Sequence, residues 1–180
     1  QGQDLAYRFQ RTVSRPELLG QPFSDDIHLA VKAVNGDGSR NLVMSVFTGE
    51  RARDPLPVPD MTGNPLLVLF LDRAVNNYHS LAGGAHPYIK QQVRAALRDK
   101  AKVESVKLDY QGKPVDALRI TVVPFLGDPN ASKMSGYEGS EFTFVVSPGV
   151  PGQLAVMSAR YESGLKDSPR LEERIALAGA

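Results

Sequence analysis

The three histidines of this 180-residue chain are the first residues to weigh for chemistry, because imidazole serves as a general base and as a metal ligand. His28 lies in an alternating segment, whereas His79 and His86 lie close together in the sequence. A zinc-binding helix would need two histidines one turn apart with a glutamate between them, and the sequence has no such motif. The pair therefore has two interpretations. In the first, His79 lies at an ordinary helix end and His86 in a turn. In the alternative, one of them is the general base of a hydrolase at a bend between helices.

Nucleophile and carboxylate patterns are equally sparse. The sequence has no Gly-x-Ser-x-Gly motif, and the Ser-x-x-Lys match at 163–166 follows a strand pattern and lacks the companion motifs of penicillin-binding enzymes. Two acidic pairs, Asp25–Asp26 and Glu172–Glu173, lie in predicted strands, where adjacent side chains point to opposite faces. We therefore predict no catalytic residue, no metal site and no cofactor.

Composition excludes several classes of protein. Lys and Arg number 21 against 20 Asp and Glu, a net charge of +1, whereas a dedicated nucleic-acid binder normally carries a basic excess. The longest apolar run is Leu66–Leu71, far short of the ~20 residues that a membrane-spanning helix needs. The chain contains no cysteine, which excludes disulfides and thiolate chemistry. We expect no nucleic-acid partner and no membrane span.

The elements that would position these residues begin as strands. Residues 5–13 and 26–34 alternate apolar and polar side chains, and Asn35–Gly38 is a strong hairpin signal before the partner strand at 41–49. The segment 50–60 carries Pro55, Pro57 and Pro59, which cannot donate to a sheet ladder. It is predicted to be an irregular connection.

Residues 64–101 predict a helical hairpin. Asn64 is a good N-cap, Pro65 suits the first helical position, and glycines at 83–84 suit the end of the first helix. The apolar side chains of this helix share one stripe: Leu67, Leu71, Ala74, Tyr78 and Leu81. A second helix opens at Pro87 with its own stripe: Ile89, Val93, Ala96 and Leu97.

The strand rhythm then resumes to the end of the chain. Residues 103–110, 115–125, 141–147 and 153–161 read as strands, and 170–177 as a last strand or a short helix. Nearly every connection is hairpin-like, so we predict an α+β fold: a curved antiparallel sheet of about seven to eight strands, packed around or against the inserted two-helix hairpin. Residues 1–180 are expected to form a single domain.

Three stretches carry a family resemblance. GNPLLVLFLDRAV, GGAHPYIKQQVRAAL and VVPFLGDPN, within residues 63–130, resemble an uncharacterised family of secreted bacterial proteins. The resemblance implies export and no assigned activity, and the predicted architecture looks like the half-barrels of lipoprotein carriers. The first residue, Gln1, fits either a processed secretory precursor or a trimmed chain. We expect a periplasmic or secreted protein.

The favoured functional hypothesis is a non-enzymatic protein that binds an apolar or lipid-like molecule in a half-barrel cavity. Phe70 and Leu71 would contact the ligand, with Tyr78, His79 and Tyr88 as polar groups near the opening. The predicted wall residues are Leu29, Val31, Val46, Leu118, Ile120, Val122, Phe142 and Phe144. The alternatives are the hydrolase and a structural or assembly protein that docks a partner through a strand edge or the basic face of the second helix.

Overall fold

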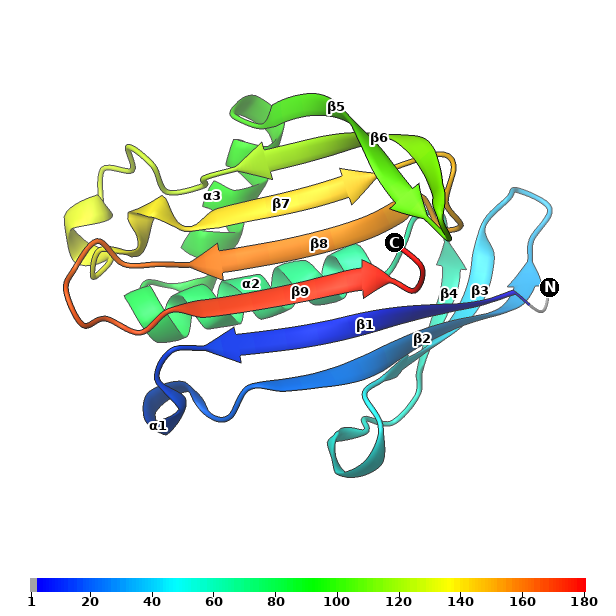
Figure 1. Cartoon of the computed structure of the whole chain (residues 1–180), viewed down its shortest axis with the longest axis horizontal. Coiled ribbons are helices and arrows are strands. Elements are labelled where there is room, and N and C mark those ends of the chain that lie inside the picture. The colour runs from blue at the N-terminus through cyan, green and yellow to red at the C-terminus, as the bar shows by residue number, and fades with distance from the viewer. Residues whose placement is uncertain (1–2) are drawn as a thin grey trace.

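A computed structural model describes residues 3–180 of the chain, and within them nine strands form one open antiparallel sheet with helices against one face (Figure 1). The strands are β1 (Asp4–Val13), β2 (Phe23–Val34), β3 (Arg40–Val46), β4 (Leu56–Met61), β5 (Lys102–Tyr110), β6 (Lys113–Val122), β7 (Glu141–Val146), β8 (Leu154–Tyr161) and β9 (Leu171–Leu177). The α-helices are α1 (Pro16–Leu19), α2 (Leu66–Ala82) and α3 (His86–Asp99). Short 3-10 turns span Gly49–Arg51, Ala131–Lys133 and Tyr137–Gly139.

The sheet consists of two meanders joined in its middle. The strand order is β4-β3-β2-β1-β9-β8-β7-β6-β5, so the first and last strands of the chain are neighbours. The α2–α3 hairpin connects the two edge strands, β4 and β5, by crossing one face of the sheet (Figure 1). We call this the inner face. The predicted α+β class, the curved antiparallel sheet and the inserted helical hairpin are confirmed.

The strand count corrects one prediction. The proline-rich segment is not irregular throughout, because its second half forms β4, which pairs with β3 through Val58 opposite Leu42 and Pro57 opposite Val43. β4 is an edge strand, and an edge strand tolerates proline because one side of its ladder needs no donors. This strand raises the sheet from the expected seven or eight strands to nine.

The predicted start and end of α2 are confirmed. Asn64 Oδ1 accepts a hydrogen bond from the Leu66 N–H at 3.1 Å, which satisfies one of the free donors at the helix start. At the other end, Gly83 has φ +76° and its N–H donates to the His79 carbonyl at 2.9 Å. A positive φ favours glycine, so the sequence itself places this helix end.

The core lies between the inner face and α2. Phe70 of α2 makes edge-to-face contacts with Phe142 and Phe144 of β7, at centroid distances of 6.3 and 5.4 Å. Of the eight predicted wall residues, Leu29, Val122, Phe142 and Phe144 are buried, and Val31, Val46 and Ile120 are half-buried. Leu118 does not fit the prediction of a filled wall, because 43% of its surface is exposed.

No helix formed by residues 3–180 combines the length and the apolarity needed to cross a bilayer.

Candidate ligand-binding cavity

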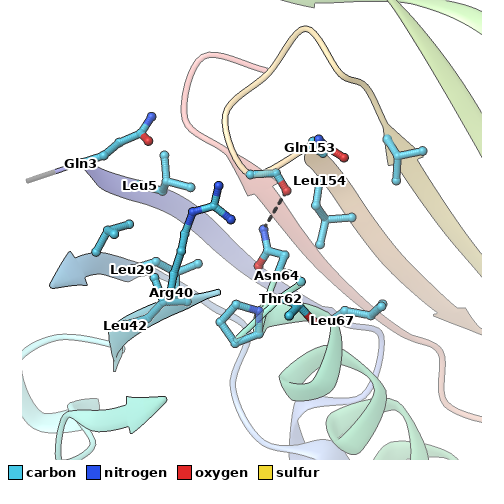
Figure 2. Close-up of a pocket in the computed structure, with 15 residues that line it drawn as sticks. Gln3, Leu5, Leu29, Arg40, Leu42, Thr62, Asn64, Leu67, Gln153 and Leu154 are labelled. Carbon is cyan, nitrogen blue, oxygen red and sulfur yellow. Dashed lines mark hydrogen bonds between the residues drawn. The ribbon is translucent and has the colours of Figure 1, made fainter. Parts of the chain in front are cut away.

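A cavity of about 510 Å³ lies on the inner face next to the start of α2 (Figure 2). Its lining comes from the N-terminal meander, the connection from β4 into α2, and the β7–β8 turn. The lining residues are Gln3, Leu5, Leu29, Val31, Arg40, Leu42, Thr62, Gly63, Asn64, Pro65, Leu67, Val146, Gly152, Gln153 and Leu154. Because α2 begins at Leu66, it leaves this end of the inner face partly uncovered.

The floor of the cavity is apolar. Leu29 of β2, Leu42 of β3 and Leu154 of β8 are 2%, 7% and 7% exposed, so they belong to the packed interior and present one side to the cavity. Leu67, on the first turn of α2, is 40% exposed and forms part of the rim. Apolar surface that faces such a space gains free energy when a ligand removes it from water.

The polar lining residues lie mainly at the rim. Gln3, Arg40 and Gln153 are exposed, and Figure 2 shows Arg40 extending from β3 towards Leu5 and Asn64. Arg40 is the one charged side chain among the described lining residues, which include no aspartate, glutamate or histidine. The cavity therefore combines an apolar floor with a positively charged rim.

Asn64 fixes the geometry at the start of α2. Besides capping the helix, its Nδ2 donates to the Tyr7 hydroxyl at 3.0 Å and to the Gly152 carbonyl at 3.3 Å. The Tyr7 hydroxyl in turn donates to the Leu154 carbonyl at 3.1 Å. Burial raises the pKa of Tyr7, so the hydroxyl keeps its proton at neutral pH. These bonds join α2 to β1 and to the β7–β8 turn, and they hold one wall of the cavity in place.

Gly152 allows the close approach on which this arrangement depends. Its φ is +71°, and a Cβ at this position would lie 3.0 Å from Leu5 Cδ1, 3.1 Å from Asn64 Nδ2 and 3.3 Å from the Tyr7 hydroxyl. A side chain here would therefore be strained in its backbone and would push against all three neighbours.

None of the five residues predicted to bind the ligand lines this cavity. Phe70 is buried in the core against β7, and Leu71 is half-buried. Tyr78 is 1% exposed, stacks on Phe125 at a centroid distance of 3.9 Å, and its hydroxyl donates to Met134 Sδ at 3.1 Å. Burial raises the pKa of Tyr78 far above its ordinary value. The structure thus uses Phe70 and Tyr78 for packing.

His79 and His86 do meet, as the sequence suggested, at the bend between α2 and α3. Their rings are tilted against each other with centroids 4.2 Å apart, and both residues are exposed. His79 Nδ1 lies 2.6 Å from the Gly84 carbonyl, and His86 Nε2 lies 3.0 Å from Asn76 Oδ1. Each ring is thus held by an amide or carbonyl oxygen, whereas an activated nucleophile would require a hydroxyl or thiol bound to the imidazole.

Tyr88 joins α3 to the loop after β6. Its hydroxyl donates to the Asp128 carboxylate, with both oxygens at 2.7 Å, and accepts a hydrogen bond from Asn130 Nδ2 at 3.0 Å. Burial and the bond to the carboxylate both raise the pKa of Tyr88. Its hydroxyl is therefore engaged within the protein.

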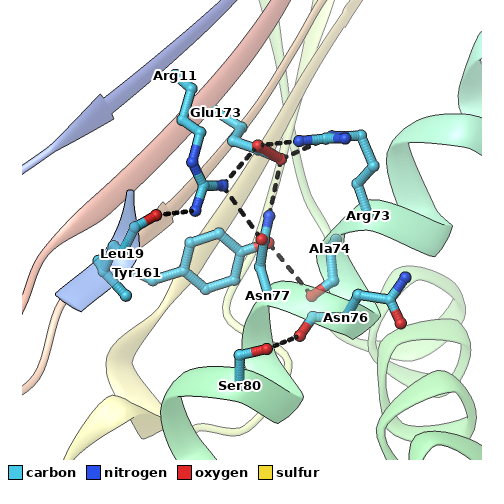
Figure 3. Close-up of polar contacts among 9 residues, drawn as sticks. All are labelled: Arg11, Leu19, Arg73, Ala74, Asn76, Asn77, Ser80, Tyr161 and Glu173. Carbon is cyan, nitrogen blue, oxygen red and sulfur yellow. Dashed lines mark hydrogen bonds and ion pairs between the residues drawn. The ribbon is translucent and has the colours of Figure 1, made fainter. Parts of the chain in front are cut away.

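A buried ion-pair network between α2 and the sheet was not predicted (Figure 3). Glu173 of β9 is 3% exposed and accepts hydrogen bonds from Arg11 at 2.9 Å and from Arg73 at 2.6 and 2.9 Å. Asn77 Nδ2 adds a bond of 2.7 Å. Burial alone would raise the pKa of Glu173, but the bonds and charge of Arg73, with Asn77 and Arg11, bring it below its ordinary value.

The sequence did hold a signal for this network. In β1 the inward positions are Leu5, Tyr7, Phe9 and Val13, and Arg11 interrupts them at the place where the alternation calls for an apolar side chain. A charged residue on the inward face of a strand implies a buried partner of opposite charge. The acidic pair at 172–173 does point to opposite faces, as predicted, since Glu172 is exposed and Glu173 is buried.

The residues that the structure describes contain no group of three or more histidine or acidic side chains arranged to hold a metal ion. The fold and the cavity together define an α+β protein with an open antiparallel sheet and a concave, largely apolar site at one end of its helical hairpin. Comparison of the sequence with protein-family models and with curated proteins gave no match. The resemblance to a secreted bacterial family therefore stays a prediction.

Proposed function

We propose that this protein binds an apolar or lipid-like small molecule in the cavity at the start of α2. The observation that carries the proposal is a preformed space of about 510 Å³ whose floor is made of Leu29, Leu42 and Leu154. Small-molecule sites typically have volumes of roughly 300–1,000 Å³ and a mainly apolar lining with a few polar groups. The cavity has both properties, and it lies at an end of the hairpin that a ligand can reach from solvent.

The lining favours binding over catalysis. Its polar side chains are three amides, one threonine hydroxyl and one guanidinium, and the described lining residues include no group that accepts a proton near neutral pH. We also propose that the protein acts in the periplasm or outside the cell. An apolar molecule needs a carrier protein to cross these aqueous spaces.

A fluorescence titration with a cavity-filling variant tests the proposal. N-phenylnaphthylamine, a neutral apolar fluorophore, should bind the native protein saturably with increased emission. Val31 is half-buried and lines the cavity, so Val31→Phe should weaken binding about tenfold or more by occupying the space. The matched control is Val103→Phe, because Val103 is a 56% exposed residue of edge strand β5 that does not line the cavity.

Two results would overturn the proposal. One is the absence of saturable fluorophore binding to the native protein. The other is equal binding by the native protein and by Val31→Phe, with both variants shown to be folded by circular dichroism, because the bound fluorophore would then lie elsewhere.

The hydrolase alternative depends on the His79–His86 pair. The close approach of the two rings is the observation in its favour, and their oxygen partners on Gly84 and Asn76 count against it. The assembly alternative depends on partner docking, and light scattering combined with size-exclusion chromatography would reveal self-association. Neither alternative accounts for the cavity, so we favour ligand binding.

A further inference from the structure

The positive charge at the rim of the cavity limits the kind of ligand that the cavity can bind. Arg40 begins β3, where its backbone is held on both sides by pairing with Val34 of β2 and Met61 of β4. Its side chain reaches towards the cavity, and the described lining includes no carboxylate that could neutralise it (Figure 2). The rim is therefore electropositive where a ligand would enter.

Arg40 is also free of partners within residues 3–180, where it makes no ion pair and no side-chain hydrogen bond. The contrast is with Arg11 and Arg73, which are both committed to Glu173. A guanidinium has five N–H donors and binds carboxylate and phosphate groups in a fixed, often bidentate geometry. Because Arg40 is exposed, it stays hydrated until an anion replaces the water.

The start of α2 adds to the same field. Asn64, Pro65 and Leu67 line the cavity, so the positive end of the dipole of this 17-residue helix lies at its wall. The first turn carries no acidic residue, although such residues commonly balance this charge. The helix end by itself would define no site, but it lies beside the cavity that Arg40 borders.

We propose that the ligand is a single-chain amphiphile with an anionic head group, that its chain lies on the floor of Leu29, Leu42 and Leu154, and that its head group pairs with Arg40. This inference rests on the proposed function and adds the charge of the ligand to it. The amides of Gln3 and Gln153, on the same rim, supply further donors for the head group.

Displacement of N-phenylnaphthylamine by matched twelve-carbon compounds tests the inference. Dodecanoate and dodecyl phosphate should each displace the fluorophore from the native protein at about tenfold lower concentration than dodecanol, a difference of about 1.4 kcal/mol. Dodecyltrimethylammonium, with the opposite charge, should be the weakest competitor. The two anions separate a fatty-acid head group from a phosphate head group, and either order between them fits the inference.

Arg40→Met should remove the preference for the anions, so that dodecanoate and dodecyl phosphate displace the fluorophore at about the same concentration as dodecanol. Arg40→Lys should keep part of the preference, because lysine retains the charge and loses the bidentate geometry. The matched control is Arg119→Met, since Arg119 is another exposed strand arginine and does not line the cavity. It should behave as the native protein does.

A measurement on the native protein tests the same charge interaction without a substitution. Raising the salt concentration from about 50 to 500 mM should weaken the displacement by dodecanoate and not that by dodecanol, because salt screens exposed charges. Persistence of the anion preference in folded Arg40→Met, or equal displacement by dodecanoate and dodecanol in the native protein, would overturn the inference. The proposed function would survive either result, because only failure of fluorophore binding to the cavity removes it.

Discussion

The middle of α2 and its N-terminal end differ in how nearby polar side chains are used. Beside the middle of the helix, Glu173 is surrounded by Arg11, Arg73 and Asn77, and every contact is within the protein. At the N-terminal end, Arg40 faces a cavity and has no partner in the described chain. A polar group whose bonds are all internal stabilises the fold, whereas one that faces open space beside an apolar floor is available to a ligand. The difference assigns a structural role to the middle of the helix and ligand binding to its N-terminal end.

Removal of the buried carboxylate of Glu173 should have the largest effect on stability and so tests this comparison most strongly. Glu173→Ala leaves Arg11 and Arg73 without their partner, with side chains only 15% and 30% exposed, so we expect a loss of about 3 kcal/mol in the free energy of unfolding. Glu172→Ala removes the adjacent, exposed carboxylate and should change it by no more than about 0.5 kcal/mol. Urea unfolding measures both, and equal losses would show that burial of Glu173 contributes nothing.

The next effect concerns the wall of the cavity. Gly152→Ala combines a positive φ with contacts of 3.0 to 3.3 Å, and should destabilise the protein by about 2 kcal/mol and weaken fluorophore binding. Gly112→Ala is the matched control, because Gly112 has φ +75° and a Cβ there would meet nothing within 4 Å. It should cost about 1 kcal/mol and leave binding unchanged. Thermal unfolding compares the stability of the two variants. If Gly152→Ala bound the fluorophore as well as the native protein does, Gly152 would not help to form the cavity wall.

Acid should reveal the Glu173 network without mutation. The folded-state pKa of Glu173 lies below its ordinary value of about 4.3, so its stabilisation is present in full above that pH and is lost as the pH falls towards the folded-state pKa. Glu173→Gln cannot titrate, and its free energy of unfolding should fall less steeply between about pH 5 and 3. Identical slopes for the two proteins in urea unfolding at each pH would refute the lowered pKa.

The smallest effect is expected at the bend between the helices. His79→Ala and His86→Ala remove exposed side chains whose partners are reachable by water, so each should change the free energy of unfolding by about 0.5 kcal/mol or less. Neither should alter fluorophore binding. If the native protein shows a hydrolytic activity that either variant abolishes, the bend between the helices carries catalysis, as the hydrolase alternative states.

Local signals in the sequence predicted much of the fold. The alternation of 5–13, the hairpin at Asn35–Gly38 and the cap at Asn64 each depend on neighbours within a few residues, and the structure confirms them. The sequence did not predict β4, because a segment with prolines can pair only where it lies at the edge of the sheet. The prolines at 57 and 59 do not show that this segment lies at an edge. Edge position is a property of the whole sheet order.

The candidate site could not be predicted from neighbouring residues, because it too depends on the arrangement of the whole fold. The cavity is built from segments as distant as Leu5, Arg40 and Gly152, and it exists because α2 begins where it does relative to the β7–β8 turn. The sequence suggested polar groups at the other end of the helix, where Tyr78 and Tyr88 have partners within the protein. Only the placement of the two meanders around α2 distinguishes a residue that packs from one that borders a cavity.

The most direct test of the central claim is an NMR titration of the folded protein with dodecanoate, following each backbone amide. Binding at the start of α2 predicts the largest shifts at Leu29, Arg40 and Gly152, with little change at His79 and His86. Shifts concentrated at the two histidines, or no shifts up to the solubility limit of dodecanoate, would contradict the assignment of this end of the helix to ligand binding.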